Sequence, residues 1–211
     1  MKKLYDEIVK HYEDCLDKHG DNHLGVDWPN QQDADTRYKV MLDIVRINAG
    51  SDASVSLLDF GCGTATLFEY IKNNGYHNIV YSGLDISQKF IDVAQTKYPD
   101  NSFYCVDILD LNKALPNFDY VIMNGVFTEK RGLSFDEMWE YFTKMIGVTY
   151  AHCNKGFAFN VMSKNVDWER EDLFHLSMDL LCGFLCKDIT RDFVIRNDYG
   201  LYEYTVYGFK K

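Results

Sequence analysis

Hydrophobic and polar positions change their period several times along this chain. Residues 55–60 form an almost continuous apolar run, and after a glycine-rich break apolar residues return at helical spacing from Leu67. A run of that kind followed by a period near 3.6 predicts a buried strand, a tight turn and a helix. The same change of period recurs downstream. It predicts strands at 79–85, 102–106, 117–123 and 156–162, and helices over 87–98, 135–150 and 168–186.

The two ends of the chain depart from this alternation. Apolar residues between Leu4 and Leu16 recur every three or four positions, which predicts an amphipathic helix ending near Gly20. A polar loop over 19–30 and a second helix over 31–49 follow. Near the other end, residues 192–196 and 202–209 flank the turn 197–200 and predict an antiparallel hairpin. Strands that alternate with helices indicate the α/β class.

Composition and charge narrow the class of partner. A chain of 211 residues with 46% hydrophobic residues suffices for one packed domain, or for one domain with a small lid. Its formal net charge is −10. Such a field repels polyanions, so we expect no nucleic-acid partner.

The cysteines and histidines give no metal-binding pattern. The six cysteines are scattered without a Cys-x-x-Cys pair, and the spacing of His19 and His23 runs through Gly20 in a loop. Buried free thiols in a reducing compartment account for the cysteines, and we expect no metal. Residues 1–18 lack an apolar leader, and no apolar stretch approaches the roughly 20 residues of a membrane span. These features predict a cytoplasmic protein without a membrane partner.

The glycine-rich break at 61–63 is a candidate ligand cradle. Gly61 and Gly63 have no Cβ, so the backbone can turn sharply and approach a ligand closely. Amides at the start of the following helix offer donors to an anionic group. A turn without a ligand is the structural alternative. A dinucleotide-binding turn needs a third glycine where this chain has Thr66, which disfavours a nicotinamide-dependent oxidoreductase.

The spacing acid-x-Gly-x-Gly-x-small, as Asp59, Gly61, Gly63 and Ala65, resembles the first motif of class I S-adenosylmethionine-dependent methyltransferases. The resemblance spans roughly residues 53–209. It implies a three-layer Rossmann-like sheet of about seven strands, mostly parallel and closed by an antiparallel hairpin. Residues 53–211 would be the cofactor-binding core, and residues 1–52 a helical lid that selects the substrate. The stretch 19–28 is also similar to an uncharacterised bacterial subgroup of small-molecule methyltransferases.

The same resemblance assigns acids at the strand ends to S-adenosylmethionine. Asp85, which ends the second strand, would bind the ribose, and Asp107 would accept a hydrogen bond from the adenine amine beside the amide of Ile108. The alternatives are that Asp85 belongs to a helix N-cap region begun by Ser87, and that Asp107 caps a loop. The predicted cofactor-binding residues are Asp59, Gly61, Cys62, Gly63, Asp85, Ile86, Asp107, Ile108 and Asn124.

The acceptor side of the site is less defined. Methyltransferases of nucleobase amines carry an Asn/Asp-Pro-Pro-aromatic tetrad where this chain reads Asn124-Gly-Val-Phe, which favours a small-molecule acceptor. His19 and His23 are the candidate bases if the nucleophile must lose a proton, and surface loop residues are the alternative interpretation of both. Behind them stand Asp27, Glu129 and Tyr199. The predicted substrate contacts are Tyr12, Trp28, Phe127 and Arg131, with Lys130 and Arg131 as an anchor for an acidic molecule.

The predicted reaction is in-line methyl transfer to an oxygen or nitrogen nucleophile of a small molecule, by a monomer or homodimer. Because the sulfonium supplies the activated methyl group, the protein would chiefly hold donor and acceptor together and exclude water. The alternatives to substrate contact are that Trp28 is a packing residue, and that Lys130 and Arg131 are a solvated pair in a surface loop. A non-catalytic module that binds S-adenosylmethionine or S-adenosylhomocysteine is the alternative function.

Overall fold

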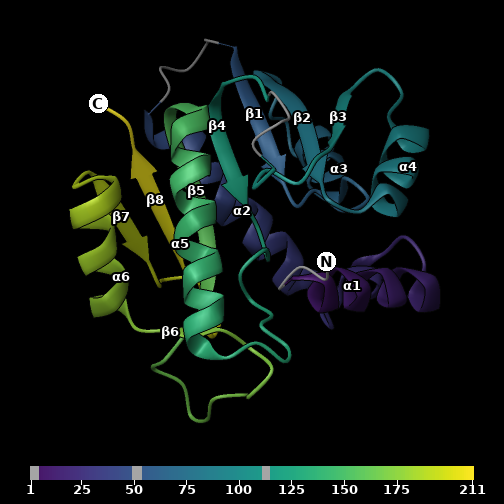
Figure 1. Cartoon of the computed structure of the whole chain (residues 1–211). Helices are drawn as coiled ribbons and strands as arrows, with labels where there is room; N and C mark the ends of the chain where they lie inside the picture. Colours follow the sequence, from purple (N-terminus) through teal and green to yellow (C-terminus); the bar gives the residue numbers. More distant parts are fainter. Residues whose placement is uncertain (1–4, 49–53, 111–114) are drawn as a thin grey trace.

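The computed structural model describes residues 5–48, 54–110 and 115–211 (Figure 1). Its elements alternate as the hydrophobic periods predict. In chain order they are α1 (Asp6–His19), the 3-10 helix η1 (His23–Val26), α2 (Gln31–Asn48), β1 (Val55–Phe60), α3 (Thr66–Asn73), β2 (Ile79–Asp85), α4 (Gln88–Lys97), β3 (Ser102–Cys105), β4 (Phe118–Met123), α5 (Phe135–His152), β5 (Cys153–Ser163), β6 (His175–Leu176), α6 (Met178–Phe184), the π-helix η2 (Leu185–Ile189), β7 (Phe193–Arg196) and β8 (Glu203–Phe209).

The strands form one sheet in the order β3-β2-β1-β4-β5-β8-β7, and the short β6 pairs with β5 off this path. Neighbours from β3 to β5 are parallel, whereas β8 runs antiparallel to both β5 and β7. The predicted α/β class and terminal hairpin are therefore confirmed. The strand order reverses between β1 and β4, so the carboxyl ends of these strands flank the crevice where open α/β sheets bind ligands.

Side chains that alternate along the central strands divide the core into two apolar layers. Leu58 and Val121 face the layer that includes α5, while Leu57 and Tyr120 face the layer that includes α2. Figure 1 shows α5 in front of the sheet and α2 behind it. The predicted three-layer arrangement results, with apolar residues on both faces of the parallel strands.

The N-terminal segment divides between two locations. Buried residues of α2, such as Met41 and Ile44, pack in the same layer as β1 and β5, so this helix belongs to the layered core. In contrast, α1 lies beyond the arrowheads of β1 and β4 and packs against η1 (Figure 1). Only α1 and η1 are thus placed over the carboxyl edge of the sheet.

The predicted helix over 168–186 is wrong over its first half. Helical structure begins only at Met178, where the Ser177 hydroxyl accepts a hydrogen bond from the amide of Leu180. Before it, the amide of Phe174 donates to the carbonyl of Thr128 at 2.8 Å, and His175 pairs with the edge of β5. The apolar residues before Met178 are buried by separate tertiary contacts and not on one face of a helix. The spacing of apolar residues alone does not distinguish a helix from such a segment.

Within the described residues, no helix combines the length and apolar character needed to cross a membrane.

Candidate active site

The turn after β1 is built from residues in the left-handed region. Gly61 and Gly63 have φ angles of 73° and 52°, and Ala65, at the N-cap of α3, has 63°. A Cβ added to Gly61 would lie 2.7 Å from the Cγ2 atom of Val126. Because L-residues adopt this region at a cost, glycine is required most clearly at Gly61, where space is also lacking.

Asp85 braces this turn from the neighbouring strand. One carboxylate oxygen accepts the amide of Gly63 at 3.0 Å, and the other accepts the amide of Ser87 at 2.9 Å. Burial raises the pKa of Asp85, and these backbone hydrogen bonds oppose the shift. A carboxylate has about four lone-pair sites, so Asp85 retains acceptor capacity for a ligand while it holds the turn.

Asp59, at the end of β1, lies deeper. Its carboxylate accepts the Tyr81 hydroxyl at 2.8 Å, and only 3% of the residue is exposed. Burial raises the pKa of Asp59 to about 7, with the Tyr81 hydrogen bond acting against the shift and the nearby Asp85 adding to it. The acid of the motif therefore titrates near neutrality.

Asp107, after β3, links the sheet edge to α1. One oxygen accepts the amide of Leu109 at 3.0 Å, so the predicted alternative of a loop-capping aspartate is present in the structure. The other oxygen accepts the hydroxyl of Tyr5, immediately before α1. An adenine amine that binds Asp107 would share this carboxylate with the first turn of α1 or displace Tyr5 from it.

A cavity lies between this edge, α1 and η1. All nine predicted cofactor-binding residues line it, together with Tyr12 and Trp28. Further wall residues, which the sequence patterns did not reveal, include Tyr5, Tyr38, Thr66, Phe90 and Tyr141. Tyr5 and Tyr12 belong to the apolar stripe of the first helix, which was the one available signal for a covering helix.

Trp28 closes the cavity on the side of β4. Its indole packs on Gly125, where an added Cβ would lie 3.2 Å from the Cζ2 atom. The guanidinium of Arg37 lies 5.2 Å from the Trp28 ring centroid and forms two hydrogen bonds with the buried Glu203, at 2.9 and 3.0 Å. The ring is thereby held between the end of β4 and a buried ion pair.

Asn124, directly after β4, has an unusual environment. The residue lines the cavity, yet its side-chain oxygen and nitrogen are buried without a hydrogen-bond partner among the described residues. An unsatisfied buried amide costs free energy, commonly about 1–3 kcal/mol per group. A bound molecule is therefore a natural source of the missing partners.

The cavity lining does not include the predicted bases His19 and His23 or the predicted substrate contacts Phe127 and Arg131, nor does it include the further candidates Asp27, Glu129, Lys130 and Tyr199. His19 ends α1, and the ring of His23 contacts the carbonyl of Trp28 at 2.6 Å, which holds it in the η1 loop. Phe127 is fully buried and packs edge-on against Phe142. The geometry thus gives His19, His23 and Phe127 no contact with a cavity ligand, and Arg131 is committed to neighbouring side chains.

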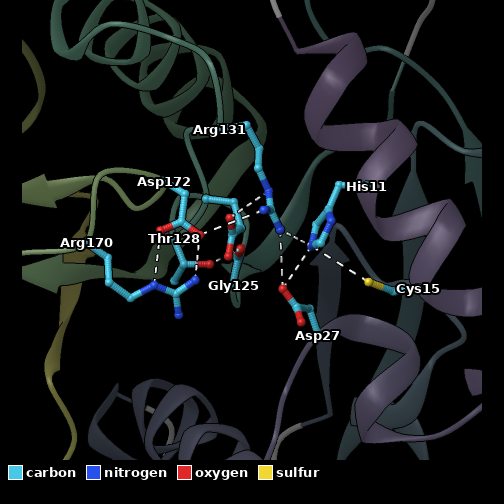
Figure 2. A network of polar contacts seen from close by, with 9 residues as sticks. His11, Cys15, Asp27, Gly125, Thr128, Arg131, Arg170 and Asp172 are labelled. Carbon is cyan, nitrogen blue, oxygen red and sulfur yellow. Dashed lines mark hydrogen bonds and ion pairs between the residues drawn. The ribbon is translucent and has the colours of Figure 1, made fainter.

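Arg131 is the centre of a polar network outside the cavity wall (Figure 2). Its guanidinium lies 2.9 Å from the Glu129 carboxylate, 3.4 Å from Asp27 and 3.8 Å from Asp172, and it also contacts His11. The contact with Glu129 joins two charges without the alignment of a hydrogen bond. Arg131 is therefore already neutralised by the protein's own carboxylates and is poorly suited to anchor an acidic substrate.

Glu129 is the buried member of this network. It is 6% exposed, and burial raises its pKa to about 7, although the charge of Arg131 opposes that shift. The segment around it pairs with Leu173 across an isolated bridge. Glu129 thus ties the loop after β4 to the segment before β6.

The structure also gathers three side chains with metal-ligating atoms. His11, Cys15 and Asp27 place such atoms within 4.8 Å of one another, and Figure 2 shows the first two side chains on α1 converging on Asp27. The guanidinium of Arg131 lies at the same point and supplies positive charge to Asp27. These residues serve as a contact between α1, η1 and the β4 loop.

Comparison with known proteins agrees with this layout. Residues 58–146, which contain the glycine turn and both strand-end aspartates, match the family model described as "Methyltransferase domain". Residues 58–146 of this chain are therefore similar to a methyltransferase domain. Rv1506c of Mycobacterium tuberculosis, which bears a provisional methyltransferase name, is 26% identical over 166 residues, covering 76% of this chain and 95% of that protein.

Two solved structures resemble this chain over nearly its whole length. Magnesium protoporphyrin IX methyltransferase of Synechocystis PCC 6803, with bound S-adenosylmethionine, has a TM-score of 0.64 at 16% identity and covers 97% of this chain and 96% of its own. The 1,6-didemethyltoxoflavin-N1-methyltransferase of Burkholderia thailandensis has a TM-score of 0.63 at 14% identity, covering 100% of this chain and 91% of its own. Likeness at such low identity concerns the fold.

Proposed function

We propose that this protein binds S-adenosylmethionine at the carboxyl edge of β1 to β3 and transfers its methyl group to a small molecule held beside the end of β4. The observation that carries the proposal is the braced turn. Gly61 and Gly63 present bare backbone to the cavity, and Asp85 fixes the turn while retaining acceptor capacity.

The residues at this edge suit the parts of the cofactor. Asp85 would accept the ribose hydroxyls, while Asp107 and the backbone at Ile108 would face the adenine. S-adenosylmethionine supplies a methyl group on a positively charged sulfur. The chain's own contribution is to hold the acceptor in line with that methyl group and to exclude water, for which α1, Tyr12 and Trp28 form the cover.

A small-molecule acceptor agrees with three features. The net charge of −10 disfavours nucleic acid, and the sequence after β4 lacks the tetrad typical of nucleobase-amine methyltransferases. In addition, the two solved relatives named above act on a porphyrin and on a toxoflavin precursor. A cavity covered by a helix at this edge suits substrates of that size better than a polymer.

The test is calorimetric titration of S-adenosylmethionine and S-adenosylhomocysteine into the wild type and Asp85→Ala. We expect the variant to bind roughly 5- to 150-fold more weakly, because lost hydrogen bonds to the ribose and the turn are worth about 1–3 kcal/mol. Asp119→Ala is the matched control. Asp119 also accepts a backbone amide, that of Ser56 at 3.0 Å, but at the opposite edge of the sheet.

Unchanged affinity in Asp85→Ala would remove this residue from the site. Stabilisation of the wild type by NAD and not by S-adenosylmethionine would overturn the cofactor assignment. Incubation with methyl-labelled cofactor and a metabolite extract then tests turnover, since incorporation of label requires an acceptor.

A further inference from the structure

We propose that the acceptor is an uncharged molecule whose nucleophile is a nitrogen, and that the Asn124 side-chain amide forms hydrogen bonds with it. The inference rests on the proposed function, because it concerns the part of the cavity that S-adenosylmethionine leaves open. It departs from two sequence-based expectations: an acidic substrate held by Lys130 and Arg131, and a cofactor-binding role for Asn124, which is assigned to the acceptor instead.

The first argument is the charge of the cavity wall. Among the described residues that line it there is no lysine, arginine or histidine, and its only ionisable acids are Asp59, Asp85 and Asp107. The guanidinium groups of Arg37 and Arg131 belong to residues outside the wall, and both are paired with acids. An anionic acceptor would have only the positive charge of the cofactor to offset the three carboxylates of the wall, with no cationic side chain to hold it, which is unfavourable in a low-dielectric site.

The second argument is the absence of a base at the acceptor end. The lining residues that come from α1, from the segment after η1 and from the loop after β4 include Tyr12, Trp28, Asn124 and Val126. Burial raises the pKa of Tyr12 well above its usual range, and the nearby Glu129 adds to the shift. Tyr12 therefore stays protonated, and apart from the strand-end aspartates the described lining includes no histidine, lysine or glutamate that could take a proton from an alcohol or phenol before attack.

A neutral nitrogen satisfies both conditions. Its lone pair forms the new N–C bond while the C–S bond breaks, and the bonding electrons remain on sulfur. The positive charge moves from sulfur to nitrogen, so the total charge in the cavity is unchanged during transfer. The resulting cation is favoured by the surrounding aspartates, and its extra proton leaves to water afterwards.

The third argument is the unpartnered amide of Asn124. Its oxygen can accept an N–H from the acceptor, and its nitrogen can donate to a neighbouring ring nitrogen or carbonyl. A hydrogen bond from the N–H of the acceptor to the amide oxygen of Asn124 would orient the attacking nitrogen, and it would not remove the proton before attack. The aromatic and apolar groups around it, Tyr12, Trp28 and Val126, favour a flat, apolar body for the acceptor.

The experiment uses the full chain saturated with S-adenosylhomocysteine and titrated with matched probes. The probes are a quinoline and an indole, each carrying either an amino group or a carboxylate at the same ring position, above neutral pH where the amines are uncharged. We expect at least one amino compound to bind tenfold or more tightly than its carboxylate counterpart. In Asn124→Ala that amino compound should lose fivefold or more in affinity, while the affinity for S-adenosylhomocysteine changes less than twofold.

Each remaining outcome contradicts a defined statement. If no amino compound binds more tightly than its carboxylate, including the case in which neither binds, the proposed acceptor class is overturned. If Asn124→Ala weakens S-adenosylhomocysteine and not the probe, Asn124 serves the cofactor. If the wild type does not bind S-adenosylhomocysteine in the first titration, the proposed function fails, and this inference fails with it.

Discussion

The two sides of the cavity are held in place by different forces. On the sheet side, the amides of Gly61 and Cys62 donate to the carbonyl of Leu84 at 2.7 and 3.0 Å, and the turn has few alternatives because its φ angles are positive. On the helix side, the attachment is made by side chains: Tyr5 and Ile8 are buried in the core, and ion pairs join Asp17 with Lys89 at 2.5 Å and Asp21, between α1 and η1, with Lys97 at 2.7 Å.

These attachments differ in strength and in reversibility. A surface ion pair contributes about 0–1 kcal/mol and weakens with salt. A buried backbone group that loses its partner costs about 1–3 kcal/mol. The comparison indicates a cofactor cradle fixed by backbone hydrogen bonds beneath a cover held by side chains alone, so the cover is the part that we expect to move when the enclosed site admits ligands.

The strongest test of the fixed cradle is Gly61→Ala. We expect the free energy of unfolding to fall by about 1–2 kcal/mol, the cost of a left-handed L-residue, with loss of cofactor affinity as the added methyl meets Val126. Gly147→Ala in α5 is the same chemical change with no atom within 4 Å of the new Cβ, and it should stabilise the protein by about 0.5–1 kcal/mol. Urea denaturation and calorimetry measure both effects. Equal behaviour of the two variants would mean that the turn is not strained.

The helix side is tested next by Arg131→Met. The change removes the positive charge beside the buried Glu129 and beside Asp27. We therefore expect the free energy of unfolding to fall by about 1–3 kcal/mol and proteolysis within α1 to be faster. Arg46→Met is the matched control, because Arg46 is 60% exposed and lies 4.0 Å from its acid, Asp43. It should change stability by less than about 1 kcal/mol.

A double variant sharpens that result. Adding Glu129→Gln to Arg131→Met removes the stranded charge and should recover part of the lost stability. If Arg131→Met is no more destabilising than Arg46→Met, the network drawn in Figure 2 does not hold α1 and η1 to the loop after β4.

The same contrast explains how far the sequence predicted the structure. The cradle is local in sequence: a strand, two glycines and acids at successive strand ends have fixed spacings, and every residue predicted from them lines the cavity. The cover depends on contacts between distant segments, such as Tyr5 with Asp107 and Arg131 with Asp27. No spacing encodes such pairs.

Periodicity fails for a related reason in two other places. The segment before α6 has helical spacing, but its apolar residues are buried by the β4 loop and by β5. His19 and His23 were singled out by residue type alone, and the backbone of α1 and η1 turns them away from the cavity. Residue type indicates chemistry only when the fold brings the side chain to the ligand.

A further test compares the pH dependence of stability contributed by one titrating acid from each side of the cavity. Burial raises the pKa values of both Asp59 and Glu129 to about 7, from ordinary values of 3.8 and 4.5. Between about pH 4.5 and 7 the folded chain therefore binds protons that the unfolded chain has released, so these two groups lower stability as pH rises through that window. Each contributes at most about 1.4 kcal/mol per pH unit. Asp59→Asn and Glu129→Gln should each reduce the fall of stability with pH, relative to the wild type, in urea titrations at several pH values.

Hydrogen exchange in α1 distinguishes the two sides of the cavity. We expect the pH dependence of exchange in α1 to change in the Glu129 variant and not in the Asp59 variant, because only Glu129 belongs to the network that contacts α1. An α1 exchange rate that responds equally to both variants would show that cradle and cover open as one unit.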